Sequence, residues 1–166
     1  MIATLCFLFA VLTIAYLESG TDDRNIEAHN PIDHGKELKE RVIAVLVCGA
    51  LICLAFNAWE WRTLYWLPMA WGLFTPSFRW WLNRKRGKDM WYIAPWSNNY
   101  DRLWYAVACW TWWTDAELRS HAIWLRDYEK STIVEVKDIR LAGRLAYITE
   151  ALVFAAAFTA FTLTNT

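Results

Sequence analysis

Histidine and carboxylate side chains gather in one polar stretch of the chain, residues 29–40. Within it, His34 and Glu37 lie three residues apart and would share one face of a helix. The stretch holds further groups of this kind: His29, Asp33 and Glu40. Imidazole and carboxylate groups together suit zinc or iron, so His34, Glu37 and His121 are the candidate ligands of a metal site. The residues favour the other interpretation, an ordinary solvated polar face.

Glu150 is the only charged residue in the apolar segment 145–163. An ionised carboxylate in hydrocarbon is unfavourable by several kcal/mol, so such a group usually faces protein, water or a partner and often has a function. A functional intramembrane carboxylate is one interpretation. The other is a glutamate at the membrane boundary that pairs with Arg144 or Arg140.

Four cations follow the third apolar segment of the chain: Arg84, Lys85, Arg86 and Lys88. A basic cluster beside a membrane span is typical of contact with anionic lipid headgroups. Basic clusters also bind nucleic acid, but the position next to an apolar segment favours the membrane. The net charge of zero likewise gives no global field that would attract nucleic acid. The polar residues around the cluster either assist a headgroup site or cap helices and close turns.

Other reactive groups give weaker signals. No Ser/His/Asp or Cys/His spacing points to nucleophilic catalysis, and we predict no cofactor. The four cysteines form no CxxC pair and are interpreted as small apolar residues: Cys6, Cys48, Cys53 and Cys109. Thirteen tryptophans favour the bilayer–water boundary, with a cage for a pigment, quinone or sterol as the alternative.

Four apolar segments must position these groups. They are long enough, or nearly so, to cross a bilayer as helices, and they comprise residues 2–18, 42–59, 63–82 and 145–163. Apolar residues make up 57% of the chain, above the roughly 45–50% of soluble domains. The first segment would be about 24 Å long. A signal peptide is its alternative interpretation, although no Lys or Arg precedes the apolar stretch.

Two residues interrupt the third segment. Pro76 is expected to kink or break its helix, because proline lacks an N–H and clashes with the preceding turn. Arg79 is expected to extend towards the membrane boundary. Gly20 indicates a turn in the polar connection before the second segment, where a new helix is expected from about residue 32, capped by Asp33.

The region between the third and fourth spans is rich in tryptophan. Residues 89–101 are predicted to form a loop. Residues 102–130 are predicted to form one or two amphipathic helices along the membrane interface, with a re-entrant hairpin as the alternative. Residues 131–140 are interpreted either as a short β-like run or as a linker.

The basic cluster also predicts the orientation of the chain. Following the positive-inside rule, residues 83–88 lie in the cytoplasm. The third segment then runs from outside to inside, the second runs the opposite way, and both termini lie outside.

Two stretches carry recurring motifs: Ile32-Asp33-His34…Arg41, and Leu82-Asn83…Arg86-Gly87-Lys88…Trp91-Tyr92-Ile93…Asp101-Arg102. They resemble small uncharacterised polytopic membrane proteins of bacteriophage and bacterial genomes. Those proteins carry a His-to-Arg step before one span and an Asn…Arg-Gly-Lys…Tyr-Ile-Gly…Asp-Arg pattern after the next. Here Ala94 replaces the glycine, and Thr75-Pro76 stands where Asp-Pro is common. The resemblance implies a phage origin and carries no activity over.

The sequence thus predicts an all-α protein, a single membrane domain over residues 1–166 with four spans and one interfacial segment. The missing catalytic constellation favours a structural or accessory protein that packs against membrane partners or copies of itself in the bilayer. Nucleic acid is not an expected partner. The alternatives are a small membrane enzyme or metal or lipid site at the cytoplasmic face, and a holin-like pore.

Overall fold

The computed structural model describes residues 1–28, 34–93, 99–109 and 133–164, and within these ranges the chain is helical, with turns and without strands. The helices are α1 (Ile2–Glu27), α2 (His34–Phe56), the short 3₁₀ helix η1 (Trp61–Tyr65), α3 (Trp66–Lys85), α4 (Asn99–Cys109) and α6 (Ile133–Leu163). The predicted all-α class is therefore confirmed over the described ranges.

Two of the described helical stretches are long and apolar enough to cross a membrane: Ile2–Glu27 and Ile139–Leu163. The apolar part of α2 is shorter, because the charged residues up to Arg41 occupy its first turns and the helix ends at Phe56. That leaves about 15 residues, or roughly 22 Å of helix. The second predicted span thus ends three residues earlier than the sequence indicated.

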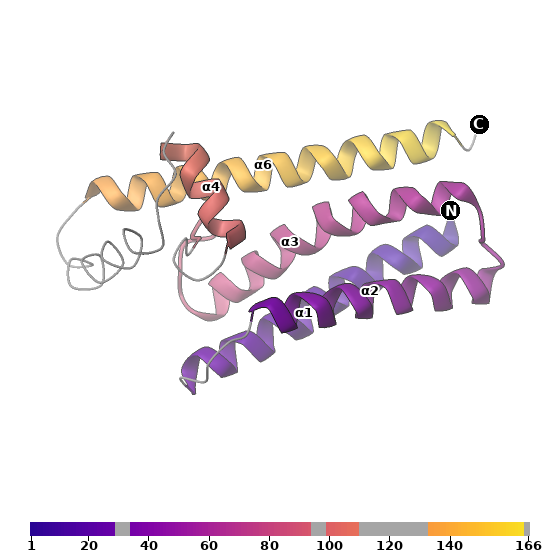
Figure 1. Cartoon of the computed structure of the whole chain (residues 1–166), viewed down its shortest axis with the longest axis horizontal. Coiled ribbons are helices and arrows are strands. Elements are labelled where there is room, and N and C mark those ends of the chain that lie inside the picture. Colours follow the sequence, from indigo (N-terminus) through magenta and orange to yellow (C-terminus); the bar gives the residue numbers. More distant parts are fainter. Residues whose placement is uncertain (29–33, 94–98, 110–132, 165–166) are drawn as a thin grey trace. The chain divides into compact units, whose positions relative to one another are not determined.

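The chain divides into two compact units, Met1–Lys88 with Thr149–Thr166, and Asp89–Ile148. In the first unit, α1 packs against both α2 and α3. Asp22 of α1 contacts Arg41 and Phe7 lies near Gly49, so α1 and α2 are antiparallel. Arg79 contacts Glu150 and the earlier Gly72 lies near the later Phe154, so α3 and the end of α6 are also antiparallel. Figure 1 shows these helices, with α1 in indigo and the end of α6 in yellow.

Side-chain packing in this unit relies on aromatic rings and small residues. The rings of Phe7 and Trp66 stack with centroids 4.6 Å apart and join α1 to α3. Gly72 faces α6 so closely that a Cβ atom there would lie 2.6 Å from the carbonyl oxygen of Glu150. A second apolar cluster, around Ile93, Tyr105, Ile139 and Ala142, forms the core of the other unit.

Residues in left-handed backbone conformations end two of the helices. Asn57 has φ 48° after α2, and Gly87 has φ 63° after α3. In each case the next amide donates back to a carbonyl five residues earlier, from Ala58 to Cys53 and from Lys88 to Asn83. These are Schellman motifs, which satisfy carbonyls that the helix leaves unpaired.

Several expected boundaries are wrong. Gly20 lies inside α1, which continues to Glu27 because its polar last turns pack on neighbouring helices. α3 continues through Pro76, so the predicted break does not occur. The hydroxyl of Thr75 donates to the carbonyl of Trp71 at 2.9 Å, one residue before Gly72, whose carbonyl loses its usual amide donor at Pro76.

The region before the last span also differs from the prediction. Residues from Ile133 onward are helical and continuous with α6, so neither a β-like run nor a linker describes them. α4 begins at Asn99, inside the predicted loop. The remainder of the predicted interfacial segment, from residue 110 to residue 130, lies outside the described residues, as does Asp33, the predicted cap of α2.

Candidate functional site

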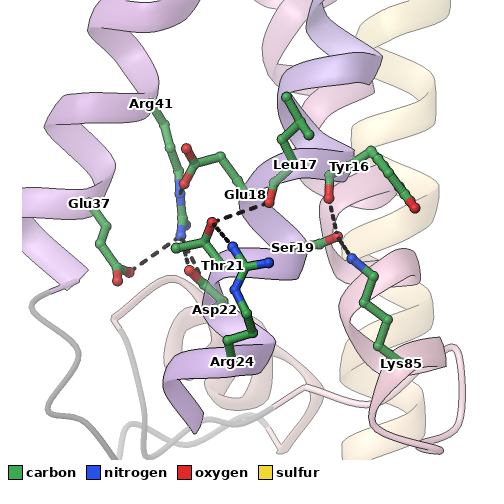
Figure 2. A network of polar contacts seen from close by, with 10 residues as sticks. All are labelled: Tyr16, Leu17, Glu18, Ser19, Thr21, Asp22, Arg24, Glu37, Arg41 and Lys85. Atoms are coloured by element: carbon green, nitrogen blue, oxygen red, sulfur yellow. Dashed lines mark hydrogen bonds and ion pairs between the residues drawn. The ribbon is translucent and has the colours of Figure 1, made fainter. Parts of the chain in front are cut away.

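Arg41 of α2 binds three carboxylates, of which two, Glu18 and Asp22, are on α1 and one, Glu37, is on α2 itself (Figure 2). Its Nη2 donates to both oxygens of Asp22, at 2.7 and 2.8 Å, and to Oε2 of Glu37 at 3.3 Å. Its Nε donates to Oε2 of Glu18, also at 3.3 Å. The guanidinium carbon lies 4.5 Å from the centroid of the Phe78 ring, so α3 provides an aromatic surface for the same cation. We call Arg41, Glu18, Asp22 and Glu37 the Arg41 cluster.

The charges of the Arg41 cluster do not balance. One guanidinium faces three carboxylates, and the Asp22 side chain is buried. Burial raises the pKa of the Glu37 carboxyl, and the negative charge of Asp22 raises it further, while Arg41 lowers it. The net direction of the pKa shift is upward, because burial disfavours the ionised carboxylate and nearby carboxylates repel it.

A second polar contact holds α1 to the end of α3. Nζ of Lys85 donates to Oγ of Ser19 at 3.1 Å and lies 4.7 Å from the centroid of the Tyr16 ring. The Ser19 hydroxyl in turn donates to the carbonyl of Tyr16 at 2.7 Å (Figure 2). Gly20 leaves the room for this lysine, since a Cβ atom there would lie 2.9 Å from Nζ.

Glu150 pairs with Arg79, and the two side chains join α6 to α3. Nη2 of Arg79 donates to Oε1 of Glu150 at 3.1 Å, and Nη1 donates to Oε2 at 3.4 Å. The Glu150 side chain is 0% exposed and that of Arg79 is 8% exposed. The expectation that Arg79 extends to the membrane boundary is therefore wrong. The sequence offered Arg144 or Arg140 as the partner of Glu150, whereas the structure pairs it with Arg79; Arg140 forms an ion pair with Asp89 at 3.0 Å.

The four predicted headgroup residues separate into different environments. The exposed Arg84 lies over the ring of Trp80, with 5.4 Å between its guanidinium carbon and the ring centroid. Lys85 is engaged with Ser19. Arg86 and Lys88 flank Gly87 in the turn after α3, where both are half-buried. Contact of these four residues with lipid headgroups stays a prediction.

The predicted metal site is described only in part. His34 begins α2, but its side chain and the whole of His121 lie outside the described residues. Glu37 binds Arg41. Within the described ranges, no group of three His, Cys, Asp or Glu side chains is placed to hold a metal ion. A site formed by His34, Glu37 and His121 therefore stays a prediction.

Sequence reasoning missed Asp22, Glu18 and Arg41 as a unit. A signal was present, because Glu18 and Asp22 are spaced by four residues at the polar end of one apolar segment and Arg41 immediately precedes the next. Such spacing places two carboxylates on one helix face. It does not say which cation they meet, because that depends on how two helices pack.

The Arg41 cluster and the Arg79–Glu150 pair hold neighbouring helices together. Glu37 in the Arg41 cluster is also a group that can gain or lose a proton. Comparisons with known proteins add nothing to this description: no family model, no curated protein and no solved structure matches the chain.

Proposed function

We propose that this chain is an integral membrane protein of four spans that works as a structural or accessory subunit. The observation that carries the proposal is that the unit formed by α1, α2, α3 and the end of α6 buries charged groups beside its apolar core and exposes many large apolar side chains. Buried positions there include charged and polar groups such as Asp22, Arg79 and Glu150, whereas large apolar side chains such as Leu46, Leu54 and Leu152 are exposed.

This distribution suits a hydrocarbon solvent. Exposed leucine is favourable against lipid tails, while ionised groups must be paired in the protein interior. The core helix of a water-soluble protein also passes a test of length and apolar composition, but such a helix is mostly buried. Here, only 28% of the apolar stretch of α1 and 22% of the apolar stretch of α6 is buried.

We propose that α2 and α3 cross the membrane together with α1 and α6. Both pack against α1, α2 antiparallel to it and α3 parallel to it, so their exposed residues share its surroundings. The exposed Trp59 and Trp61, between α2 and α3, suit the bilayer–water boundary at one end. The basic residues after α3 suit the cytoplasmic boundary at the other, which orients both termini outside.

The accessory role is supported by how the charged and small residues are used. The Arg41 cluster and the Arg79–Glu150 pair link helices to each other. On α6, Ala151 and Ala155 are exposed one turn apart, and small residues at this spacing let a second helix approach closely in lipid. We therefore propose that the protein acts by packing α6 against a copy of itself or another membrane protein.

The experiment is to express the full chain and to measure its mass in mild detergent by light scattering. We expect a membrane fraction that resists alkaline washing and a complex larger than one chain. Ala155→Trp should reduce the complex to a monomer without release from the membrane. Leu152→Trp is the matched control, because it changes an exposed residue that is already large.

Two outcomes would contradict the proposal. A polypeptide that stays monodisperse in buffer without detergent would exclude the membrane location. A membrane-bound wild type that is a monomer without a bound membrane protein would exclude the accessory role.

A further inference from the structure

The end of α3 combines an exposed cation with aromatic rings. Arg84 is exposed and its guanidinium lies over the ring of Trp80. Trp80 contacts Trp81 edge to face, and Trp81 contacts Tyr16 of α1 in the same way, with centroids 5.7 and 5.5 Å apart. Aromatic rings of this kind favour the level of lipid headgroups, where one end of the ring is apolar and the other is wet.

An exposed apolar side chain is the chain neighbour of Tyr16. Leu17, which follows Tyr16 on α1, is 61% exposed. In a bilayer, an exposed leucine contacts hydrocarbon, while the guanidinium of an exposed arginine such as Arg84 reaches the phosphate level. This placement follows only if the unit is embedded in a bilayer, so the inference rests on the proposed function.

The carboxylates at the same end of α1 and α2 include four with cation partners other than Arg84. Glu18, Asp22 and Glu37 bind Arg41, and Glu40 lies 3.9 Å from Lys36. Lys85 is directed to Ser19 and Tyr16, so it contributes to contact between α1 and α3. Among the four cations that the sequence singled out, Arg84 is therefore the one whose position best suits an external anion.

We propose that Arg84, supported by the Trp80 ring, binds the phosphodiester group of an anionic phospholipid in the cytoplasmic leaflet. A guanidinium presents several N–H donors in a plane and matches two phosphate oxygens at once. An anionic lipid adds net charge that a zwitterionic lipid lacks, and each Lys or Arg near an anionic surface contributes about five-fold in affinity. The site therefore discriminates by headgroup charge.

The test uses the full chain, delipidated in mild detergent and titrated with phosphatidylglycerol or phosphatidylcholine of identical acyl chains. Native mass spectrometry measures the bound lipid. We expect tighter binding of phosphatidylglycerol. Arg84→Gln should weaken phosphatidylglycerol binding about five-fold and phosphatidylcholine binding less, so that the difference in affinity between the two lipids shrinks. Lys39→Gln is the matched control, because Lys39 is another exposed cation, near the start of α2.

Equal affinity for the two lipids would overturn the inference, as would equal losses in Arg84→Gln and Lys39→Gln. Displacement of phosphatidylglycerol by millimolar inorganic phosphate would also overturn it, because the site would then take free phosphate instead of lipid. A different result would contradict the proposed function: the chain would stay in solution without detergent. A protein that requires detergent but does not distinguish the lipids contradicts this inference alone.

Discussion

Glu150 and Arg79 stabilise the contact between α3 and α6 through opposite charges that are both withdrawn from solvent. Removing one partner leaves an uncompensated buried charge, which typically destabilises by about 3–5 kcal/mol. We expect Glu150→Gln and Arg79→Gln each to destabilise the protein by about 3 kcal/mol, measured by thermal unfolding in detergent.

The charge-reversed double variant Arg79→Glu/Glu150→Arg separates pairing from other effects of these substitutions. It should recover a large part of the lost stability, because opposite charges again face one another. If the double variant is no more stable than the single variants, the ion pair is not what holds the two helices together.

Glu37 makes the stability of the α1–α2 contact depend on pH. Burial and the nearby Asp22, Glu18 and Glu40 raise its pKa above the ordinary value of 4.5, and Arg41 opposes them. A group whose pKa is higher in the folded state stabilises that state while protonated, and this contribution is lost as the pH rises through the folded pKa. We expect Glu37→Gln to be more stable than the wild type at pH 8 and equally stable at pH 4.

The control for this prediction is Glu40→Gln, which alters an exposed carboxylate on the same helix. Unfolding temperatures of both variants and of the wild type, measured from pH 4 to pH 8, check the expectation. A Glu37→Gln variant that loses stability at pH 8 would mean that the Arg41 contact outweighs the repulsion among the carboxylates.

At the scale of the elements, Gly72 determines how closely α3 and α6 approach. A Cβ atom there would also lie 2.9 Å from the amide nitrogen of Phe154, so the backbones must move apart to accept any side chain. We expect Gly72→Ala to cost about 1–3 kcal/mol in unfolding free energy, as overpacked sites do. Thermal unfolding followed by tryptophan fluorescence measures the change.

Gly49→Ala provides the comparison for Gly72. Its Cβ would lie 3.3 Å from the Phe7 ring, an aromatic edge that can shift slightly. Alanine also has a higher helix propensity than glycine, by up to about 1 kcal/mol. We therefore expect Gly49→Ala to be close to neutral. Equal losses for the two variants would show that the glycines matter for a reason other than helix distance.

At the scale of the first unit, several charged side chains lie inside beside the apolar core, while many large apolar side chains lie outside. Two contacts between distant parts of the chain, Arg41 with Asp22 and Arg79 with Glu150, bring charges into the interior. Each of these side chains alone on a helix in lipid would be unfavourable. The pairs therefore favour one particular set of helix neighbours: Arg41 with Asp22 joins α1 to α2, and Arg79 with Glu150 joins α3 to α6.

The sequence by itself determined the helical class and the positions of the long apolar helices. Runs of apolar residues over residues 2–18 and 145–163 suffice for this, since hydrogen bonding within a helix is local and hydrophobicity is a property of each segment. The sequence also predicted the basic residues after α3 and the helix start near residue 34, because each of these features depends on neighbours in the chain.

Tertiary structure alone decided the partners of the charged residues and the true ends of several helices. Nothing local to Glu150 indicates Arg79, since the two lie 71 residues apart, and the spacing of Glu18 and Asp22 does not identify Arg41. Likewise α1 continues past Gly20 and α3 past Pro76, because packing against neighbouring helices outweighs the local preferences of glycine and proline. Side-chain pairing and close helix contact depend on three-dimensional proximity, which a pattern along one segment does not contain.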